Sequence, residues 1–404
     1  MVQVTKFPNP FKPGAGHMPP FLAGRENETK EFKRIISQTT ILENLILTGL
    51  RGLGKTVLLE TFKPMAIQDG WLWAGTDLSE STSISEDHLA TRLLTDLSVV
   101  TSSVVVSTTE RPMFGLTTKT EQVTAALDYV TLKTTYDQIP GLVSDKLKGI
   151  LEAVWPLLQR CGKRGVIFAY DEAQNLADHA AKDQYPLSLL LDVFQSLQRK
   201  NLPYMLVLTG LPTLFPKLVE ARTYAERMFR VIFLDPLTEQ ETNDAVTRPI
   251  KDSKCPVSFS PTSLHTIWEI TKGYPYFIQY VCREAYDVWV QNVEDGKTPE
   301  SIPSDAIMRK LDSDFFAGRW ARTTDRQRAL LWVISQLPNS ESEFAVQEVV
   351  EHPANKGLDK AFSGSHVNQM LSALSDAGLI YKNRHGKYSF AVPLLGGFIR
   401  RQAV

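Results

Sequence analysis

Four residues near the N-terminus, Gly49, Gly54, Lys55 and Thr56, have the types and spacing of a phosphate-binding loop. They belong to the stretch LILTGLRGLGKT, which fits the pattern G-x-x-x-x-G-K-[ST]. In such a loop, glycines let successive backbone N–H groups point at phosphate oxygens, the lysine reaches the β- and γ-phosphates, and the hydroxyl holds Mg²⁺. The N-terminus of the following helix favours the same anion. The residues predicted to bind a nucleotide here are Gly49, Gly52, Gly54, Lys55, Thr56 and Val57, with Thr56 also a metal ligand.

A second group that could perform chemistry is the acidic pair Asp171 and Glu172. It ends an apolar run in the stretch GVIFAYDEAQNL, residues 165–176. A phosphate-loop ATPase needs one carboxylate for the Mg²⁺ shell and often a second one to polarise the attacking water. We therefore predict that Asp171 is the metal ligand and Glu172 the general base, with Lys55 as the catalytic lysine.

Two further catalytic candidates have alternatives that the residues leave open. Thr209 ends the apolar run LVLT and would contact the γ-phosphate or the water, or else cap the next helix. Arg222, Arg227 and Arg230 precede another apolar run, and one of them would serve as an arginine finger for a neighbouring subunit. Arg227 and Arg230 are the preferred ones, and the alternative is an ordinary exposed arginine.

The rest of the sequence limits the class of protein. A chain of 404 residues predicts two or three domains, and a net charge of −1 gives no overall attraction to nucleic acid or membrane. The three cysteines show no C-x-x-C spacing, no apolar run approaches the ~20 residues of a membrane span, and the N-terminus lacks a signal-peptide pattern. The absence of an N-K-x-D motif favours ATP over GTP. These features predict a cytoplasmic protein that does not enter a membrane.

The elements that must position these residues read as an α/β domain. Buried strands are expected at residues 45–48, 71–74, 166–170, 205–209 and 231–234, and amphipathic helices at 142–159 and 187–198. This alternation predicts a doubly wound parallel sheet. The β-branched stretch 98–109 would form a hairpin or a pairing edge.

A different pattern follows Pro236. A capping box at Thr238 and Glu241 opens a series of helices, expected at 238–247, 263–271, 276–293 and 304–316. Helices at 325–336, 344–351 and 365–377 then precede a hairpin of residues 379–382 and 387–391, whose turn contains Gly386. Three helices followed by a hairpin is the order of a winged helix-turn-helix.

With these motifs in hand, the chain resembles the AAA+ and STAND-type ATPases, most closely the origin-recognition-like branch. The elements that carry the resemblance occur in the family's order: PFLAGRENETKEF, the phosphate loop, DEAQ, LTG and GYPYFIQ. The resemblance implies an extended segment (residues 1–20), a phosphate-loop α/β domain (21–236), a helical lid (237–322) and a winged helix-turn-helix (323–404).

The resemblance also implies further site residues. Phe21, Gly24 and Arg25 match the segment that lines the adenine pocket, and Gly273 and Pro275 match the lid element that contacts base or ribose. The sequence departs from the family at the lid, where Tyr274-Pro-Tyr276 occupies the place of a sensor arginine, so hydrolysis is expected to be slow or dependent on assembly. The long interval before Asp171 implies an insertion at 98–139.

The C-terminal segment offers a possible surface for DNA. From Gly364 onward there are five Lys/Arg and one acid, and residues 319–328 hold four arginines and one aspartate. Local basic charge on a nearly neutral chain is typical of phosphate contact. The candidate nucleic-acid contacts are His366, Asn368 and Gln369 on the expected recognition helix and Lys382, Arg384 and Lys387 on the wing. A protein-binding role for the winged helix is the alternative.

Two functions therefore remain open. One is an ATPase of the origin-recognition type that uses ATP and Mg²⁺ to control its assembly, as a homo-oligomer or with a protein partner, and its grip on duplex DNA. The other is a STAND-like switch, closed with ADP and opened by ATP, in which the winged helix binds protein or locks the nucleotide domain.

Overall fold

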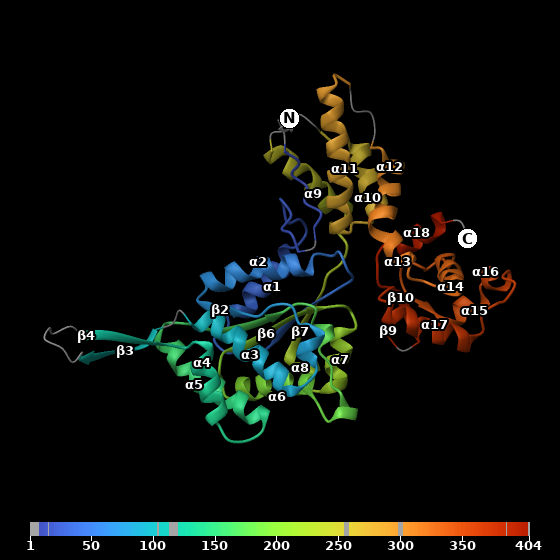
Figure 1. Cartoon of the computed structure of the whole chain (residues 1–404). Helices are drawn as coiled ribbons and strands as arrows, with labels where there is room; N and C mark the ends of the chain where they lie inside the picture. The colour runs from blue at the N-terminus through green and yellow to red at the C-terminus, as the bar shows by residue number, and fades with distance from the viewer. Residues whose placement is uncertain are drawn as a thin grey trace. The chain divides into compact units, whose positions relative to one another are not determined.

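The computed structural model describes residues 8–14, 16–102, 105–112, 120–253, 258–297, 302–384 and 386–402. Its contacts divide the chain into two compact units. The sheet unit comprises Asn27–Thr48 and Leu58–Phe233, and the helical unit comprises Met1–Glu26, Gly49–Val57 and Leu234–Val404. Figure 1 labels the elements of both units along the chain. The phosphate loop, which directly follows a strand of the sheet unit, makes its contacts mainly within the helical unit.

The sheet unit is built on five parallel strands in the order β2-β5-β6-β1-β7. The three central strands are buried along their whole length, as expected for parallel strands covered on both faces. All five predicted strands and the parallel α/β class are confirmed. The strands are β1 (Asn44–Thr48), β2 (Trp71–Ala74), β5 (Gly165–Tyr170), β6 (Tyr204–Gly210) and β7 (Phe229–Phe233).

Helices surround this sheet and bury their apolar stripes against it. The stripe of α5 buries Leu147, Ile150, Leu151, Val154 and Leu158, as its spacing predicted, while Leu157 is only partly buried. The helices of this unit are α1 (Glu26–Ile36), α2 (Lys55–Gln68), α3 (Glu86–Thr101), α4 (Tyr129–Gln138), α5 (Val143–Arg160), α6 (Pro186–Arg199), α7 (Leu214–Ala221) and α8 (Ala225–Met228), with short 3₁₀ turns at Glu80–Ser83, Ala173–Asn175 and Ala180–Lys182.

The β-branched stretch 98–109 divides between a helix and a strand. Residues 98–101 form the last turn of α3, in which Ser98 and Thr101 are buried and Val99 is exposed. Beyond them, β3 (Val105–Pro112) pairs antiparallel with β4 (Thr120–Ala126) as a separate two-stranded sheet. Figure 1 shows this hairpin extending beyond α4 and α5. The predicted insertion therefore contains a hairpin, and its first four residues are helical instead of extended.

The helical unit contains the lid and C-terminal elements. Its helices are α9 (Glu239–Asp252), α10 (Pro261–Thr271), α11 (Pro275–Glu294), α12 (Ser304–Leu311), the π-helical turn η4 (Asp312–Phe316), α13 (Ala317–Trp320), α14 (Asp325–Ser335), α15 (Val346–Glu351), α16 (Pro353–Lys356), α17 (Gly364–Asp376) and α18 (Leu395–Arg401). A three-stranded sheet has the order β8-β10-β9, from β8 (Phe344–Ala345), β9 (Ile380–Arg384) and β10 (Lys387–Phe390). The predicted helices and hairpin are present, except that the helix expected at 344–351 begins at Val346, because residues 344–345 pair with β10 as strand β8. The winged-helix assignment stays a prediction.

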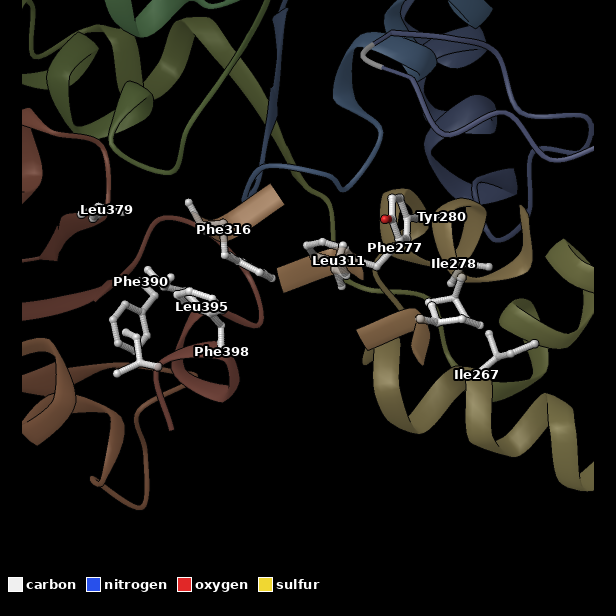
Figure 2. Packing of buried hydrophobic residues seen from close by; sticks show 14 of the residues in the cluster. Ile267, Phe277, Ile278, Tyr280, Leu311, Phe316, Leu379, Phe390, Leu395 and Phe398 are labelled. Atoms are coloured by element: carbon white, nitrogen blue, oxygen red, sulfur yellow. The ribbon is translucent and has the colours of Figure 1, made fainter. Parts of the chain in front are cut away.

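One hydrophobic core joins the lid elements to the C-terminal elements, as Figure 2 shows. Phe316, in η4, is fully buried; its ring stacks on Phe398 of α18 at 5.0 Å between centroids and lies 6.2 Å from Phe277 of α11. Because a close-packed aromatic contact of this kind leaves no gap between the two groups of elements, they share their stability. In the described part of the chain, no helix is long and apolar enough to span a membrane.

Replacing Phe316 by alanine is expected to destabilise the helical unit by about 3–5 kcal/mol, because a buried aromatic ring is lost and a cavity remains. Urea unfolding followed by circular dichroism measures the change. The matched control is Phe233→Ala, since Phe233 is 61% exposed. Equal unfolding midpoints for the two variants would contradict the shared core.

Candidate nucleotide site

The phosphate loop connects β1 to α2 and needs its glycines. Gly52 and Gly54 have φ angles of 83° and 86°, a region that side chains with a Cβ rarely adopt. Lys55 is the first residue of α2, and its Nζ donates to the carbonyl oxygens of Gly49 and Leu50, both at 2.9 Å. The loop backbone therefore holds the lysine ammonium at the loop itself.

Two groups of the helical unit hold the loop backbone. The N–H of Tyr276 donates to the carbonyl of Gly52 at 3.2 Å. The guanidinium of Arg25, only 6% exposed, donates to the carbonyls of Leu53 at 3.2 Å and Asp235 at 2.9 Å. Arg25, which the resemblance placed at the adenine pocket, thus fixes the loop through backbone contacts. Tyr276, in the segment where the resemblance predicted a sensor arginine, contributes its backbone N–H to the same loop.

The predicted glycines Gly24 and Gly273 both pack against Leu237. Gly24 has φ 63° and Gly273 has φ 73°, and a Cβ at Gly273 would lie 2.0 Å from the carbonyl oxygen of Leu237. The backbone N–H of Leu237 donates to the Gly273 carbonyl at 2.8 Å, which holds the two segments together. Only glycine fits such a close approach, so the lid element at 273 has a firm structural requirement for its residue type.

Phe21, predicted at the adenine pocket, and Pro275, predicted in the lid, have different surroundings. The Arg248 guanidinium of α9 lies 4.3 Å from the centroid of the Phe21 ring, a cation–π contact. Pro275 is the first residue of α11, a position that suits proline because the N–H there has no partner within the helix. Phe21 therefore lies against the second half of α9, and Pro275 begins α11.

An open cavity of about 500 Å³ lies between the N-terminal segment and α11. The Asn9 amide fastens the segment by donating to the Arg283 carbonyl at 2.9 Å and to Asp287 at 2.8 Å. Gly16 comes within contact of Thr56 in the loop, since a Cβ there would lie 3.3 Å from Thr56 Cγ2. We predicted no role for this segment, because proline and glycine residues carry no periodic signal. The lining residues are Asn9, Phe11, Lys12, Pro13, Gly14, His17, Arg283 and Asp287.

The acidic pair follows β5 in the sheet unit. Asp171 is 5% exposed, and its Oδ1 accepts the Thr209 hydroxyl and, at 2.7 Å, the backbone N–H of Glu172. Thr209 does not cap the next helix, since α7 has Thr213 as its N-cap residue. Glu172 itself has a left-handed backbone, φ 52° and ψ 35°, which is uncommon for a residue with a side chain of this size. Strained backbone of this kind gathers at functional sites.

The three candidate arginines of the sheet unit have different surroundings. Arg222 donates twice to Asp192 of α6, at 2.9 and 2.8 Å, and this pairing raises the pKa of the guanidinium. Arg230, in β7, pairs with Glu31 of α1 at 2.9 Å. Arg227 is exposed on α8, and the described residues supply no carboxylate to it. Of the three, Arg227 is thus the one whose guanidinium is open to a partner molecule.

Thr56 and Asp171 are the two residues predicted to bind magnesium. Magnesium in nucleotide sites keeps several waters and takes only one or two protein ligands besides the phosphates. The described ranges contain no cluster of three or more His, Cys, Asp or Glu side chains able to hold a metal by themselves. The buried carboxylate of Asp171 and the hydroxyl of Thr56 are the oxygen ligands that this ion prefers.

The candidate DNA contacts lie on two elements of the helical unit. On α17, Val367, Leu371 and Leu374 are buried, while His366, Asn368 and Gln369 are exposed. Lys382 of β9 is exposed, and Lys387 of β10 lies 3.5 Å from Glu348. Arg384 ends β9, but its side chain is outside the described residues.

The tertiary structure offsets part of the basic charge counted from the sequence. Arg401 donates to both oxygens of Asp312, at 2.8 and 2.5 Å, and Arg400 lies 3.3 Å from Glu341. Arg326 stacks over the Phe362 ring at 3.7 Å. The acids that pair with Arg400 and Arg401 come earlier in the chain. A count of charges that starts at Gly364 therefore overstates the positive charge of this segment.

Comparison with known proteins agrees with this architecture. A family model described as a domain of unknown function (DUF8462) matches residues 313–399. No curated protein matches the chain. Among solved structures, the chain is similar to the Walker-type ATPase of Pyrococcus abyssi, with a TM-score of 0.56 and 15% identity over 94% of this chain and 96% of that one. It is also similar to the ORC2 protein of Aeropyrum pernix in its ADP form, with a TM-score of 0.52 and 13% identity over 97% of this chain and 98% of that one.

At this level of identity the comparison shows the fold. The family model begins within η4 and covers the C-terminal helices and hairpin. Both solved structures are matched along almost their whole length. The resemblance drawn from the sequence motifs is therefore confirmed at the level of fold, and the chain has the phosphate-loop α/β fold of the Walker-type and ORC-type ATPases.

Proposed function

We propose that this chain binds ATP with Mg²⁺ and hydrolyses it to ADP and phosphate. The observation that carries the proposal is the placement of two motifs at one sheet edge. The phosphate loop follows the last residue of β1 and Asp171 follows the last residue of β5, and both strands pair in parallel with β6. The carboxyl ends of parallel strands are where α/β sheets bind their ligands. One of the similar structures is described as a Walker-type ATPase and the other as an ADP form, which supports the same proposal.

Each proposed role follows from side-chain chemistry. Lys55 and the loop N–H groups would bind the phosphates, and Thr56 with Asp171 would hold Mg²⁺. When bound, the ion would neutralise charge that develops on the transferred phosphoryl group. Glu172 would accept a proton from the attacking water. Thr209 would orient Asp171, to which it donates a hydrogen bond.

The remaining site proposals concern the base and a second subunit. We assign the adenine to the surroundings of Phe21, Gly24, Gly273 and Pro275, with Arg25 holding the loop beside it. Arg227 is the proposed finger that a neighbouring copy of the chain, or a protein partner, would receive. Such an arrangement makes hydrolysis depend on assembly, in keeping with the replacement of the sensor arginine by Tyr276.

We further propose that the C-terminal elements form a winged helix that binds duplex DNA. The exposed polar residues of α17 have the hydrogen-bonding groups that read base edges, and Lys382 has the charge that contacts phosphate. The internal pairing of Arg400 and Arg401 predicts a modest affinity in which few phosphates are neutralised.

Replacing Lys382 by alanine is expected to weaken DNA binding equally for different sequences and to lower the salt-dependence slope by about one. Fluorescence anisotropy with labelled duplex DNA at several salt concentrations measures both quantities. The control is Lys356→Ala, which removes an exposed lysine of α16 outside the proposed surface. If both variants and the unaltered protein bind with one slope, Lys382 contacts no phosphate.

A second candidate function has its own observation. Arg51 of the phosphate loop lies close to Gly378, just after α17, where a Cβ would be 3.8 Å from its Nη1. Burial and the neighbouring Arg51 lower the pKa of Arg319, so Arg51 also approaches α13. This contact favours a switch in which the C-terminal elements lock the loop. ATP turnover with and without duplex DNA separates the two: stimulation by DNA supports the first, and tightly co-purifying ADP without DNA affinity supports the second.

A further inference from the structure

The side chain of Gln174 connects the ends of strands β5 and β6. Its amide group donates to Glu172 Oε2, and its Oε1 accepts the backbone N–H of Leu211 at 3.2 Å. A primary amide has both donors and an acceptor, so one side chain serves both contacts. Leu211 directly follows β6, which carries Thr209 near its end. The glutamine therefore links the acid after β5 to the backbone after β6.

Gln174 is itself held in place by its surroundings. It lies in the 3₁₀ turn Ala173–Asn175, and its carbonyl accepts the Lys217 ammonium of α7 at 2.8 Å. Burial lowers the pKa of Lys217, which marks this contact as shielded from water. These contacts fix the backbone from which the amide extends.

Gly210 shows that the chain makes room for this amide. A Cβ at residue 210 would lie 2.7 Å from Gln174 Oε1, closer than real Cβ contacts allow. The absence of a side chain at Gly210, in the LTG motif, therefore leaves the space that the Gln174 amide, in the DEAQ motif, occupies. Two short motifs, almost forty residues apart in sequence, are complementary at this point.

Glu172 depends on such support because its backbone is left-handed. A residue held in this uncommon region persists only where its neighbours determine its position. The Glu172 carboxylate accepts a hydrogen bond from the Gln174 amide, while the backbone N–H of Glu172 donates to Asp171. The direction of the carboxylate is therefore set by the glutamine amide.

We propose that Gln174 is a positioning residue for Glu172, which aims the carboxylate and couples it to the end of β6. The proposal rests on the proposed hydrolysis for its catalytic consequence. A base displaced by about 1 Å loses up to a hundredfold in rate, so loss of the amide donor affects the chemical step more than nucleotide binding.

The test compares Gln174→Glu and Gln174→Ala with Asn175→Ala in steady-state ATP turnover. Glutamate keeps the size and an acceptor oxygen but cannot donate to Glu172 when ionised. We expect both Gln174 variants to lower kcat by about ten- to a hundredfold, with KM for ATP changed less than about twofold. Asn175 donates to the Leu78 carbonyl at 2.9 Å and is the control for the turn, with turnover close to the unaltered protein. A Gln174→Glu protein with the original kcat would overturn the proposal.

A second measurement separates this proposal from the proposed function. Hydrogen exchange of the peptide containing Leu211, in nucleotide-free protein, reports the coupling without any hydrolysis. We expect both Gln174→Ala and Glu172→Ala to speed exchange there, and Asn175→Ala to leave it unchanged. If Glu172→Ala has no effect at Leu211, the link between the acid and β6 is absent and the proposal fails. Failure of hydrolysis alone, in the unaltered protein, would count against the proposed function and leave this exchange result standing.

Discussion

Replacing Glu172 by glutamine is expected to leave ATP bound but to slow its hydrolysis by about a thousandfold, the central range for loss of a general base. The change keeps the size of the side chain and removes only the group that accepts a proton. Glu172 follows strand β5 and does not belong to the phosphate loop. ATP binding should therefore survive its replacement. Single-turnover hydrolysis of pre-bound ATP and calorimetric titration of ATP measure the two quantities separately.

Glu220→Gln is the control for this change. Glu220 is an exposed glutamate of α7 in the same unit, and its replacement should leave both rate and affinity unaltered. Normal turnover by the Glu172→Gln protein would show that the base has been assigned wrongly, while the assignment of the phosphate loop would remain.

Replacing Lys55 by alanine is expected to weaken ATP binding by about thirty- to a hundredfold. A charge-assisted contact to phosphate contributes ~2–3 kcal/mol, and each ~1.4 kcal/mol is a tenfold change in affinity. Lys55 Nζ already lies against the carbonyls of Gly49 and Leu50, so the ammonium is at the loop before any nucleotide arrives. Displacement of a fluorescent ATP analogue measures the affinity.

Lys63→Ala provides the matched lysine for comparison. Lys63 is exposed on the same helix, α2, two turns beyond the loop. Its loss should not change ATP affinity. Equal affinities of the Lys55→Ala and Lys63→Ala proteins would mean that the loop does not bind phosphate.

Much of the architecture was predictable because local sequence signals were strong. The three central strands of the main sheet are short apolar runs, as is typical of parallel strands buried on both faces. The helix at 239–252 begins where the capping box at Thr238 and Glu241 predicted, since the two residues satisfy each other's backbone N–H groups. The stretch 98–109 was harder to predict, because β-branched residues favour strands, whereas Ser98 and Thr101 lie on the buried face of α3.

The candidate site was less predictable than the fold. The glycines of the loop and of the predicted lid were predictable, because their backbone conformations require glycine and a sequence motif shows such positions directly. The contacts of Arg25 with Leu53 and Asp235 join residues far apart in sequence, and no local pattern records them. The ion pair of Arg401 with Asp312 likewise lowers the positive charge that the sequence predicted for the C-terminal segment.

By itself, the sequence of this protein determined its parallel α/β class, its phosphate loop and the acidic pair, because each depends on residue types at fixed short spacings. Only the tertiary structure decided which side chains hold those motifs in place. Gln174 reaches Leu211, Thr209 reaches Asp171, and Phe316 joins two groups of helices. The physical reason is that hydrogen bonds and packing act over a few ångströms in space, whatever the separation along the chain.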